Sequence, residues 1–381
     1  MSTYSYRTPG AILSGSGSIK ETGTALSELG VKKPAIVCDK GIEKAGIAGK
    51  VADVIKSAGY SVDIIAEAEP EPRASTINEI VPEIRSGGFD CLIGLGGGSS
   101  LDSAKLLSVL SVLQGETDVR DFLGIDLVQK PGLSTLMIPT TAGTGSEVTP
   151  NAIVSLPDEG RKAGAVSRHL VPDMAILDPE LTLGLPPDAT AATGLDALIH
   201  CLESYISKKA NVLADGYSLQ GLTLISSSLR EAYHHGNDIA AREKMLIGAC
   251  YGGMALTASG TAAVHALAYS TGAKYHIPHG VANSMLLVPV LERSMDMCEE
   301  RLIEAGAAMG VQPNAKAVLD YLRELADELG IPKSLETYGY KDSDLEELVV
   351  AASKVTRLLD NNPKSFSLDD IRDIFIAISK A

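Results

Sequence analysis

Residues 91–105 read CLIGLGGGSSLDSAK, and this stretch indicates the fold more directly than any other. The apolar run Cys91–Leu95 predicts a buried strand, and the residues from Leu101 onward predict a helix. Glycines between them let a ligand approach the backbone closely, and the start of the following helix favours an anion. The stretch therefore predicts a phosphate-binding strand–loop–helix unit, although a glycine-rich turn can also simply end a strand.

Short apolar or β-branched runs alternate with helical patterns on both sides of this unit. The predicted strands are 35–38, 62–65, 91–95, 135–138 and 174–177, and the predicted helices include 47–57 and 75–86. Such alternation is typical of a parallel sheet covered by helices. After GLPPD at 184–188, strand-forming runs become scarce and Ala- and Leu-rich helical patterns continue. We predict an α/β domain over 1–185 and an all-helical domain over 186–381.

Composition narrows the class of protein. The 381 residues, of which 45% are hydrophobic and 21% charged, suit two globular domains of ordinary size. A net charge of −15 argues against a nucleic-acid or anionic-membrane surface. We expect a cytoplasmic protein, because there is no apolar run of about 18 residues or secretion signal. Its five scattered cysteines suit reduced thiols.

Asp196 and His200 lie in GLDALIHCLESYI, a strong helical pattern. Their spacing of four places both side chains on one face of that helix. Such pairs are common on solvated faces, but the neighbouring residues here are almost all apolar. A carboxylate and an imidazole buried together need a partner, which favours a metal-binding role for this pair.

Two further histidines, His265 and His279, stand in a second helical region. On one straight helix they would lie roughly 21 Å apart, too far to share an ion. Gly272 and Pro278 lie between them and can break the helix, so that His279 can fold back. Three imidazoles and one carboxylate suit a divalent transition metal such as Fe, Zn, Co, Ni or Mn.

A second loop, PTTAGTGSE at 139–147, follows another predicted strand. Its hydroxyls suit a pyrophosphate or ribose, although Ser146 can instead cap a helix. Asp39 ends the first predicted strand, where an acid can bond a ribose 2′-hydroxyl and repel a 2′-phosphate. A solvated acid at a strand end is the alternative. Asp39 precedes the glycine loop, so this is not the usual dinucleotide fingerprint.

Together these segments resemble the iron-containing (group III) alcohol dehydrogenase family over nearly the whole chain. The motifs that carry the resemblance are GGGSSLDSAK at 96–105, PTTAGTGSEVT at 139–149, ATGLDALIHCLESY at 192–205, VHALAYSTGAKYHIPHGVAN at 264–283 and DNNPKSFSLDDI at 360–371. The resemblance implies a Rossmann-like parallel sheet in the N-terminal domain and an all-α, metal-binding C-terminal domain.

The resemblance also implies the chemistry of the chain. It indicates hydride transfer between NAD and a small primary alcohol or aldehyde at Fe²⁺, with Zn²⁺ as the alternative metal, in a homodimer or higher homo-oligomer. The implied metal ligands are Asp196, His200, His265 and His279. The implied cofactor-binding residues are Gly97, Gly98, Ser99, Asp102, Thr140, Thr141, Thr144 and Lys162, with Asp39 favouring NAD over NADP.

One position departs from the family pattern. Many members carry a histidine four residues after the third metal ligand, where it is assigned to a proton relay. Here that position is Tyr269, whose unperturbed pKa of ~10 makes it a poorer acid or base near neutrality. His276 lies seven residues further on, on the same face if the helix continues. We predict that His276, with Tyr269, carries the proton; the alternative is that His276 packs locally or orients His279.

Two other functions remain open at this point. One is a zinc enzyme on the same scaffold, similar to glycerol dehydrogenase or dehydroquinate synthase. The PTTAGTGSE loop and the set of one aspartate and three histidines speak against it. The other is a cofactor-binding assembly protein without catalysis, against which the complete set of metal ligands argues.

Overall fold

The computed structural model describes residues 4–380, and their contacts divide them into two compact units. The α/β unit consists of residues 7–141 and 145–184. The helical unit consists of the described residues from 185 onward, together with 142–144 and the described residues up to Tyr6. The fold class predicted from the sequence is confirmed.

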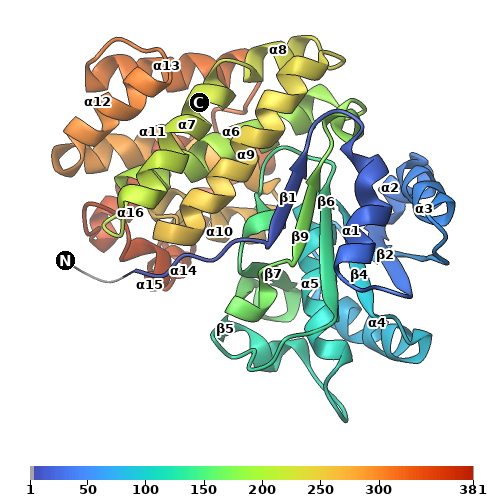
Figure 1. The fold of residues 1–381 in the computed structure, drawn as a ribbon. Coiled ribbons are helices and arrows are strands. Elements are labelled where there is room, and N and C mark those ends of the chain that lie inside the picture. Colours follow the sequence, from blue (N-terminus) through green and yellow to red (C-terminus); the bar gives the residue numbers. More distant parts are fainter. Residues whose placement is uncertain (1–3, 381) are drawn as a thin grey trace. The chain divides into compact units, whose positions relative to one another are not determined.

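The α/β unit is built on a fully parallel, six-stranded sheet in the order β1-β9-β6-β4-β2-β3 (Figure 1). The strands are β1 Ala11–Ser14, β2 Pro34–Asp39, β3 Asp63–Ala68, β4 Cys91–Gly96, β6 Ser134–Pro139 and β9 Met174–Leu177. All except β1 were predicted. Because the strands are parallel, their carboxyl ends share one edge, where ligands bind in open α/β sheets.

Helices cover both faces of this sheet. They are α1 Thr22–Glu28, α2 Lys40–Lys44, α3 Ile47–Ser57, α4 Ala74–Gly87 and α5 Gly98–Ser111. Successive side chains of a strand point to opposite faces, so Ile36 and Cys38 join the core under α1 and α3, whereas Ala35 and Val37 join the core under α4 and α5. Burial on both faces explains why the central strands read as continuous apolar runs.

A second sheet, which the sequence did not reveal, has the order β5-β8-β7. It contains β5 Gly124–Ile125, β7 Asn151–Leu156 and β8 Arg161–Val166, with β7 and β8 antiparallel. The sequence RKAGAV of β8 is too rich in small and charged residues to show a strand pattern. The short 3₁₀ helices of the unit are η1 Ser18–Glu21, η2 Val119–Phe122, η3 Ser146–Val148, η4 Pro157–Glu159, η5 Arg168–Leu170 and η6 Pro179–Thr182.

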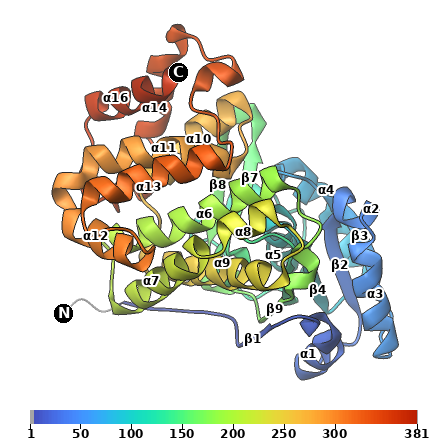
Figure 2. The same cartoon turned by 90° about the horizontal axis from the view of Figure 1, so that it is seen from above.

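The helical unit is arranged around α6, Pro187–Ile206, which packs against α7, α8, α9, α11 and α12 (Figure 2). Its other helices are α7 Val212–Ser226, α8 Leu229–His234, α9 Ile239–Ser259, α10 Ala263–Tyr275, α11 His279–Ser294, α12 Glu299–Ala308, α13 Ala315–Glu328, α14 Leu345–Ser353, α15 Thr356–Leu359 and α16 Leu368–Ser379. The 3₁₀ helices are η7 Met295–Met297, η8 Leu335–Tyr338 and η9 Asp342–Asp344.

Two further predictions concern the whole chain. In the part that the structure describes, no helix combines the length and the apolar character needed to cross a membrane. All five cysteines are free thiols and all are buried.

Candidate metal centre

Helix α6 carries Asp196 and His200 one turn apart, and both side chains are buried. His200 Nδ1 lies 3.2 Å from the carbonyl oxygen of Gly143, so a proton on Nδ1 is donated there and Nε2 is left to bind a cation. A side chain at Gly143 would collide with Thr193, because its Cβ would stand 2.7 Å from the Thr193 Cβ. The glycine-rich 139–147 loop thus orients a histidine of α6.

Helix α10 carries His265 close to its first turn, and Glu203 of α6 holds the ring. His265 Nδ1 donates to the Glu203 carboxylate at 2.6 Å. The same carboxylate accepts from the backbone N–H groups of Ala262, at 3.0 Å, and Val264, at 2.6 Å, and so satisfies the start of α10. His265 Nε2 is buried and has no hydrogen-bond partner among the described residues. That nitrogen is the atom left for a metal ion.

The predicted break between the last two histidines exists. Helix α10 ends at Tyr275, His276 adopts a left-handed backbone with φ 53°, and α11 begins at His279 directly after Pro278. Gly272, the other residue expected to break the helix, lies inside α10. The prediction was wrong there because a single glycine weakens a buried helix without ending it.

Close packing of α11 on α6 brings His279 to the site. The next residue, Gly280, has no side chain, and a Cβ there would stand only 2.0 Å from the carbonyl oxygen of Ala192. Any larger residue would push the start of α11 away from α6, and His279 with it.

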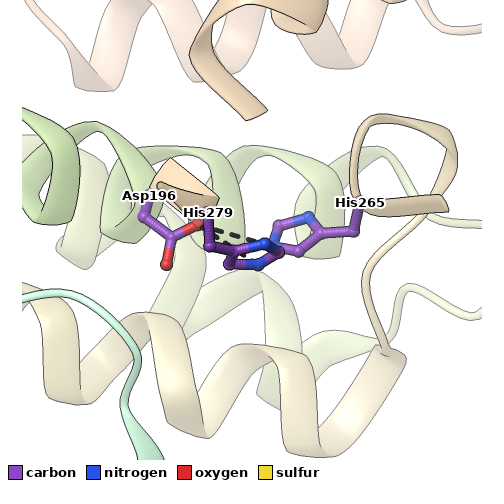
Figure 3. Close-up of side chains that lie close together, drawn as sticks. All are labelled: Asp196, His265 and His279. Atoms are coloured by element: carbon purple, nitrogen blue, oxygen red, sulfur yellow. Dashed lines mark ion pairs between the residues drawn. The ribbon is translucent and has the colours of Figure 1, made fainter. Parts of the chain in front are cut away.

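Asp196, His265 and His279 each offer one ligand atom within 4.8 Å of the other two (Figure 3). Asp196 Oδ1 lies 3.6 Å from His265 Nε2 and 3.9 Å from His279 Nε2. Ligand bonds of 2.0–2.2 Å in a tetrahedron would separate such atoms by about 3.4 Å, so the three residues fit a divalent ion with small adjustments. His200 Nε2 lies 4.0 Å from Asp196 Oδ2, outside the group of three, and its role as the fourth ligand stays a prediction.

Charge balance within the site also favours a cation. Burial alone would raise the pKa of Asp196, but His200, His279 and His265 hold it well below its ordinary value. Burial also disfavours a charged His265, yet the nearby carboxylates of Asp196 and Glu203 raise its pKa to about 9. Without a metal, a proton on His265 compensates the two buried carboxylates. Binding a divalent cation would replace that proton.

Asn283 of α11 links two of these side chains. Its Nδ2 donates to Asp196 Oδ1 at 2.8 Å and lies 3.2 Å from His279 Nε2. The side chains of Asp196 and His265 are each 4% exposed, whereas that of His279 is 33% exposed. A metal ion or substrate therefore has access from the side of His279.

The two groups predicted for proton transfer differ in their surroundings. Tyr269 is half-buried, and its ring centroid lies 5.8 Å from that of His279. His276 is exposed. The helix does not continue to His276, because α10 ends at Tyr275 and the backbone of His276 is left-handed. Helical spacing therefore does not place His276 on the same face as Tyr269. The part of either residue in proton transfer stays a prediction.

Asp39 lies at the sheet edge as expected, at the carboxyl end of β2. Its Oδ1 accepts from the backbone N–H groups of Gly41, at 2.7 Å, and Ile42, at 3.1 Å, and so caps α2. Its Oδ2 accepts from Ser100 Oγ at 3.3 Å. The contact joins the acid after β2 to the glycine loop after β4.

The two predicted phosphate loops meet at the same edge. Gly97 is the N-cap of α5, and Gly98 and Ser99 begin that helix. Thr140, directly after β6, donates its backbone N–H to the carbonyl oxygen of Gly96 at 2.9 Å. An anion placed at the start of α5 would face the positive end of the helix dipole and the backbone N–H groups of the first turn.

Two other predicted cofactor residues have partners within the protein. Both oxygens of the buried Asp102 accept hydrogen bonds, from Ser146 Oγ at 2.5 Å and from the Ile153 N–H at 2.9 Å. Lys162, on β8, forms an ion pair of 2.6 Å with Glu71. The cofactor contacts of these residues stay predictions, as do those of Asp39, Gly97, Gly98, Ser99, Thr140, Thr141 and Thr144.

Sequence reasoning missed the residues that position the predicted ligands. Glu203 gave one usable signal, because it is another acidic side chain in the apolar part of the helix that carries Asp196 and His200. Asn283 gave none. Asn361, in the closing motif, donates to the carbonyl oxygen of Thr261 at 2.8 Å and so steadies the entry to α10.

Comparison with known proteins agrees with this architecture. The family model described as "Iron-containing alcohol dehydrogenase" matches residues 9–179. The model described as "Fe-containing alcohol dehydrogenase family, C-terminal" matches residues 190–379. The two matches together span nearly the whole chain.

Individual relatives agree in sequence and in structure. Long-chain-alcohol dehydrogenase 1 of Geobacillus thermodenitrificans (strain NG80-2) is 38% identical over 372 residues, covering 95% of this chain and 93% of the relative. A crystal structure of 1,3-propanediol oxidoreductase superimposes with a TM-score of 0.94 at 31% identity, covering 98% of this chain and 99% of the other. Sulfoacetaldehyde reductase from Bifidobacterium kashiwanohense, in complex with NAD⁺, gives a TM-score of 0.89 at 26% identity, covering 100% and 99%.

Proposed function

Because the chain belongs to the iron-containing alcohol dehydrogenase family, we propose that it interconverts a small primary alcohol and its aldehyde at Fe²⁺ held by Asp196, His200, His265 and His279. The family places it among the NAD-dependent oxidoreductases that act on alcohols and aldehydes. The observation that carries the proposal is the meeting of Asp196, His265 and His279 around one point (Figure 3).

The residues around the ligands prepare this point for a cation. Glu203 and the carbonyl of Gly143 each take an imidazole Nδ1–H, which leaves both Nε2 atoms for the metal. Asn283 holds the Asp196 carboxylate. A divalent metal bound here would polarise the substrate oxygen as a Lewis acid, and NAD would carry the hydride.

Oxidation of an alcohol also releases a proton from the substrate oxygen. Tyr269, which lies beside His279, and His276 are the groups proposed to move it.

Asp39 supports NAD over NADP as the cofactor, because its carboxylate contacts the glycine loop through Ser100. A carboxylate there would bond a ribose hydroxyl and repel a 2′-phosphate. The names of the relatives refer to long-chain alcohols, a diol and a sulfonated aldehyde, so family membership leaves the substrate open.

The remaining proposals concern the setting of the enzyme. Five buried free thiols support a reducing cytoplasm, and the net charge of −15 supports the absence of a nucleic-acid partner. A homodimer or higher homo-oligomer is proposed from the family.

A metal-replacement assay tests the function. Protein stripped with a chelator and reloaded with Fe²⁺ or Zn²⁺ without oxygen is mixed with NADH or NADPH and a panel of short aldehydes, and absorbance of the reduced cofactor is followed. We expect oxidation that needs both the metal and an aldehyde, with NADH preferred. Full turnover by the metal-free protein would refute the proposed mechanism.

A further inference from the structure

Glu71 has an unusual backbone at the edge of the sheet where the cofactor residues gather. It follows β3 and stands between Pro70 and Pro72 with φ 56°. A positive φ is uncommon for a residue with a side chain. A residue that precedes a proline also favours extended backbone, so the conformation of Glu71 is unfavourable for two reasons. Strain of this kind persists where surrounding contacts enforce it and is frequent at functional sites.

Three contacts hold Glu71 in place. Its N–H donates to Ser99 Oγ of the glycine loop at 3.2 Å. Its carboxylate accepts from Lys162 Nζ at 2.6 Å. The next residue, Pro72, accepts at its carbonyl from the N–H of Ser155, on β7, at 2.8 Å.

The ion pair gives Lys162 a carboxylate partner within the protein. The side chain of Lys162 is only 10% exposed, so its charge is compensated within the protein by Glu71. The neighbouring Glu69 cannot replace that partner, because its carboxylate is paired with Arg73, whose Nε donates to it at 2.9 Å.

Glu71 and Asp39 both contact the glycine loop, Asp39 through its carboxylate and Glu71 through its backbone N–H. Asp39 accepts from Ser100 and Glu71 donates its N–H to Ser99, so the acids contact consecutive residues at the start of α5. NAD presents ribose hydroxyls to such carboxylates, whereas NADP adds a phosphate with further negative charge. Specificity between the two depends on what opposes NADP as much as on what binds NAD.

We propose that Glu71 is a cofactor-specificity residue that selects NAD(H) over NADP(H). Its carboxylate pairs with the Lys162 ammonium and so withholds that positive charge from a 2′-phosphate. The inference rests on the proposed function, since it assumes that the dinucleotide binds at this edge of the sheet.

Direct binding to the metal-loaded full chain tests the role of Glu71. The chain has no Trp, so fluorescence of the reduced nicotinamide reports NADH and NADPH binding without that background. In Glu71→Gln we expect the ratio of the NADPH to the NADH dissociation constant to fall about tenfold, because a negative charge leaves and Lys162 is released. In Glu69→Gln, which removes a neighbouring carboxylate from a different pair, we expect a change of less than about twofold.

Two further variants complete the test. Glu71→Gly removes the carboxylate and permits the left-handed backbone, so it should reproduce the fall even if Glu71→Gln folds poorly. Adding Lys162→Gln to Glu71→Gln should reverse most of the gain in NADPH affinity.

The outcomes separate this inference from the function on which it rests. An unchanged ratio in both Glu71 variants, with NADH still bound, would overturn the role of Glu71 alone. An equal fall in Glu69→Gln would also overturn it, because general charge would then explain the effect. A wild-type protein that binds neither reduced cofactor would overturn the proposed function instead.

Discussion

The two units each bury a pair of carboxylates, but they do so in different ways. In the helical unit, Asp196 and Glu203 stand among three imidazoles, and His265 Nε2 has no hydrogen-bond partner among the described residues. In the α/β unit, Asp102 and Glu147 stand around the buried ammonium of Lys105. We call the latter group, Asp102, Lys105, Ser146 and Glu147, the loop clamp.

In the loop clamp, contacts within the protein use most of the polar atoms. Lys105 Nζ donates to the carbonyl oxygens of Asn151, at 2.7 Å, and Thr149, at 3.1 Å, and lies 3.6 Å from Asp102 Oδ1. Ser146 donates to Asp102 and thereby fixes the 139–147 loop on α5. Burial lowers the pKa of Lys105 and raises that of Asp102, as expected for charges removed from water.

The buried charges of the loop clamp stabilise the fold, whereas those of the metal centre are arranged to bind a cation. Both regions contain acids that an apolar environment would reject if they were alone. The loop clamp compensates its acids with a lysine of the chain itself. The metal centre holds imidazoles with one nitrogen fixed by a protein partner and the other directed at a shared point, which is the arrangement that a cation requires.

His265→Ala should cause the largest loss of function among these variants. A small loss would contradict the difference drawn between the metal centre and the loop clamp. Removing an imidazole that faces the shared point should abolish stoichiometric metal binding and lower turnover by about a thousandfold or more, since the metal supplies several kcal/mol of transition-state stabilisation. Metal analysis and kcat measured on the same sample check this. The exposed His235→Ala is the control, and equal losses in both variants would contradict a specific role for His265.

Glu147→Gln tests how a buried acid of the loop clamp affects the stability of the protein. Burial raises the pKa of Glu147 to about 7, from an ordinary value of 4.5. A raised folded-state pKa means that the folded protein binds this proton more tightly, so the stability it confers is present below pH 4.5 and is lost as the pH rises to about 7. The loss amounts to about 3 kcal/mol.

The measurement is urea unfolding of the protein between pH 4.5 and pH 7. Glu147→Gln should remove this part of the decline, because glutamine stays neutral throughout. Glu116→Gln, at an exposed position of the same unit, should leave the decline unchanged. A wild-type stability curve that is flat or rising with pH over this interval, and equally so in Glu147→Gln, would show that Glu147 is ionised in the folded protein.

Glu203→Gln should have the smallest effect of the three and test the positioning of His265. The carbonyl oxygen of a glutamine can accept from at most two of the three present donors, and its NH₂ group meets the remaining donor with the wrong polarity. Loss of such a partner of a metal ligand typically lowers metal affinity 10- to 100-fold. Competition with a chelator measures it; an unchanged metal affinity together with a lowered melting temperature would reduce Glu203 to a cap of α10.

Local sequence patterns predict much of this architecture. The buried strands β2, β4, β6 and β9 and helix α3 were predicted within one or two residues, because burial on two faces or on one stripe leaves a strong periodic signal. Strands β7 and β8 were missed, since half-buried strands with small or charged residues carry little signal. Helix α4 contains Pro82, yet it continues through that residue to Gly87, because tertiary packing outweighs local propensity.

Local patterns in the chain establish which residue types stand at which spacing: one aspartate and three histidines on helical segments with a proline between the last two, and a glycine loop between a strand and a helix. The partners of these residues depend on how the chain packs. Glu203 meets His265 across 62 positions, Gly143 meets His200 across 57, Asn283 meets Asp196 across 87, and Glu71 meets Lys162 across 91. Hydrogen bonds and ion pairs depend on distances of a few ångströms, and such distances between remote segments follow from packing, which no local pattern records.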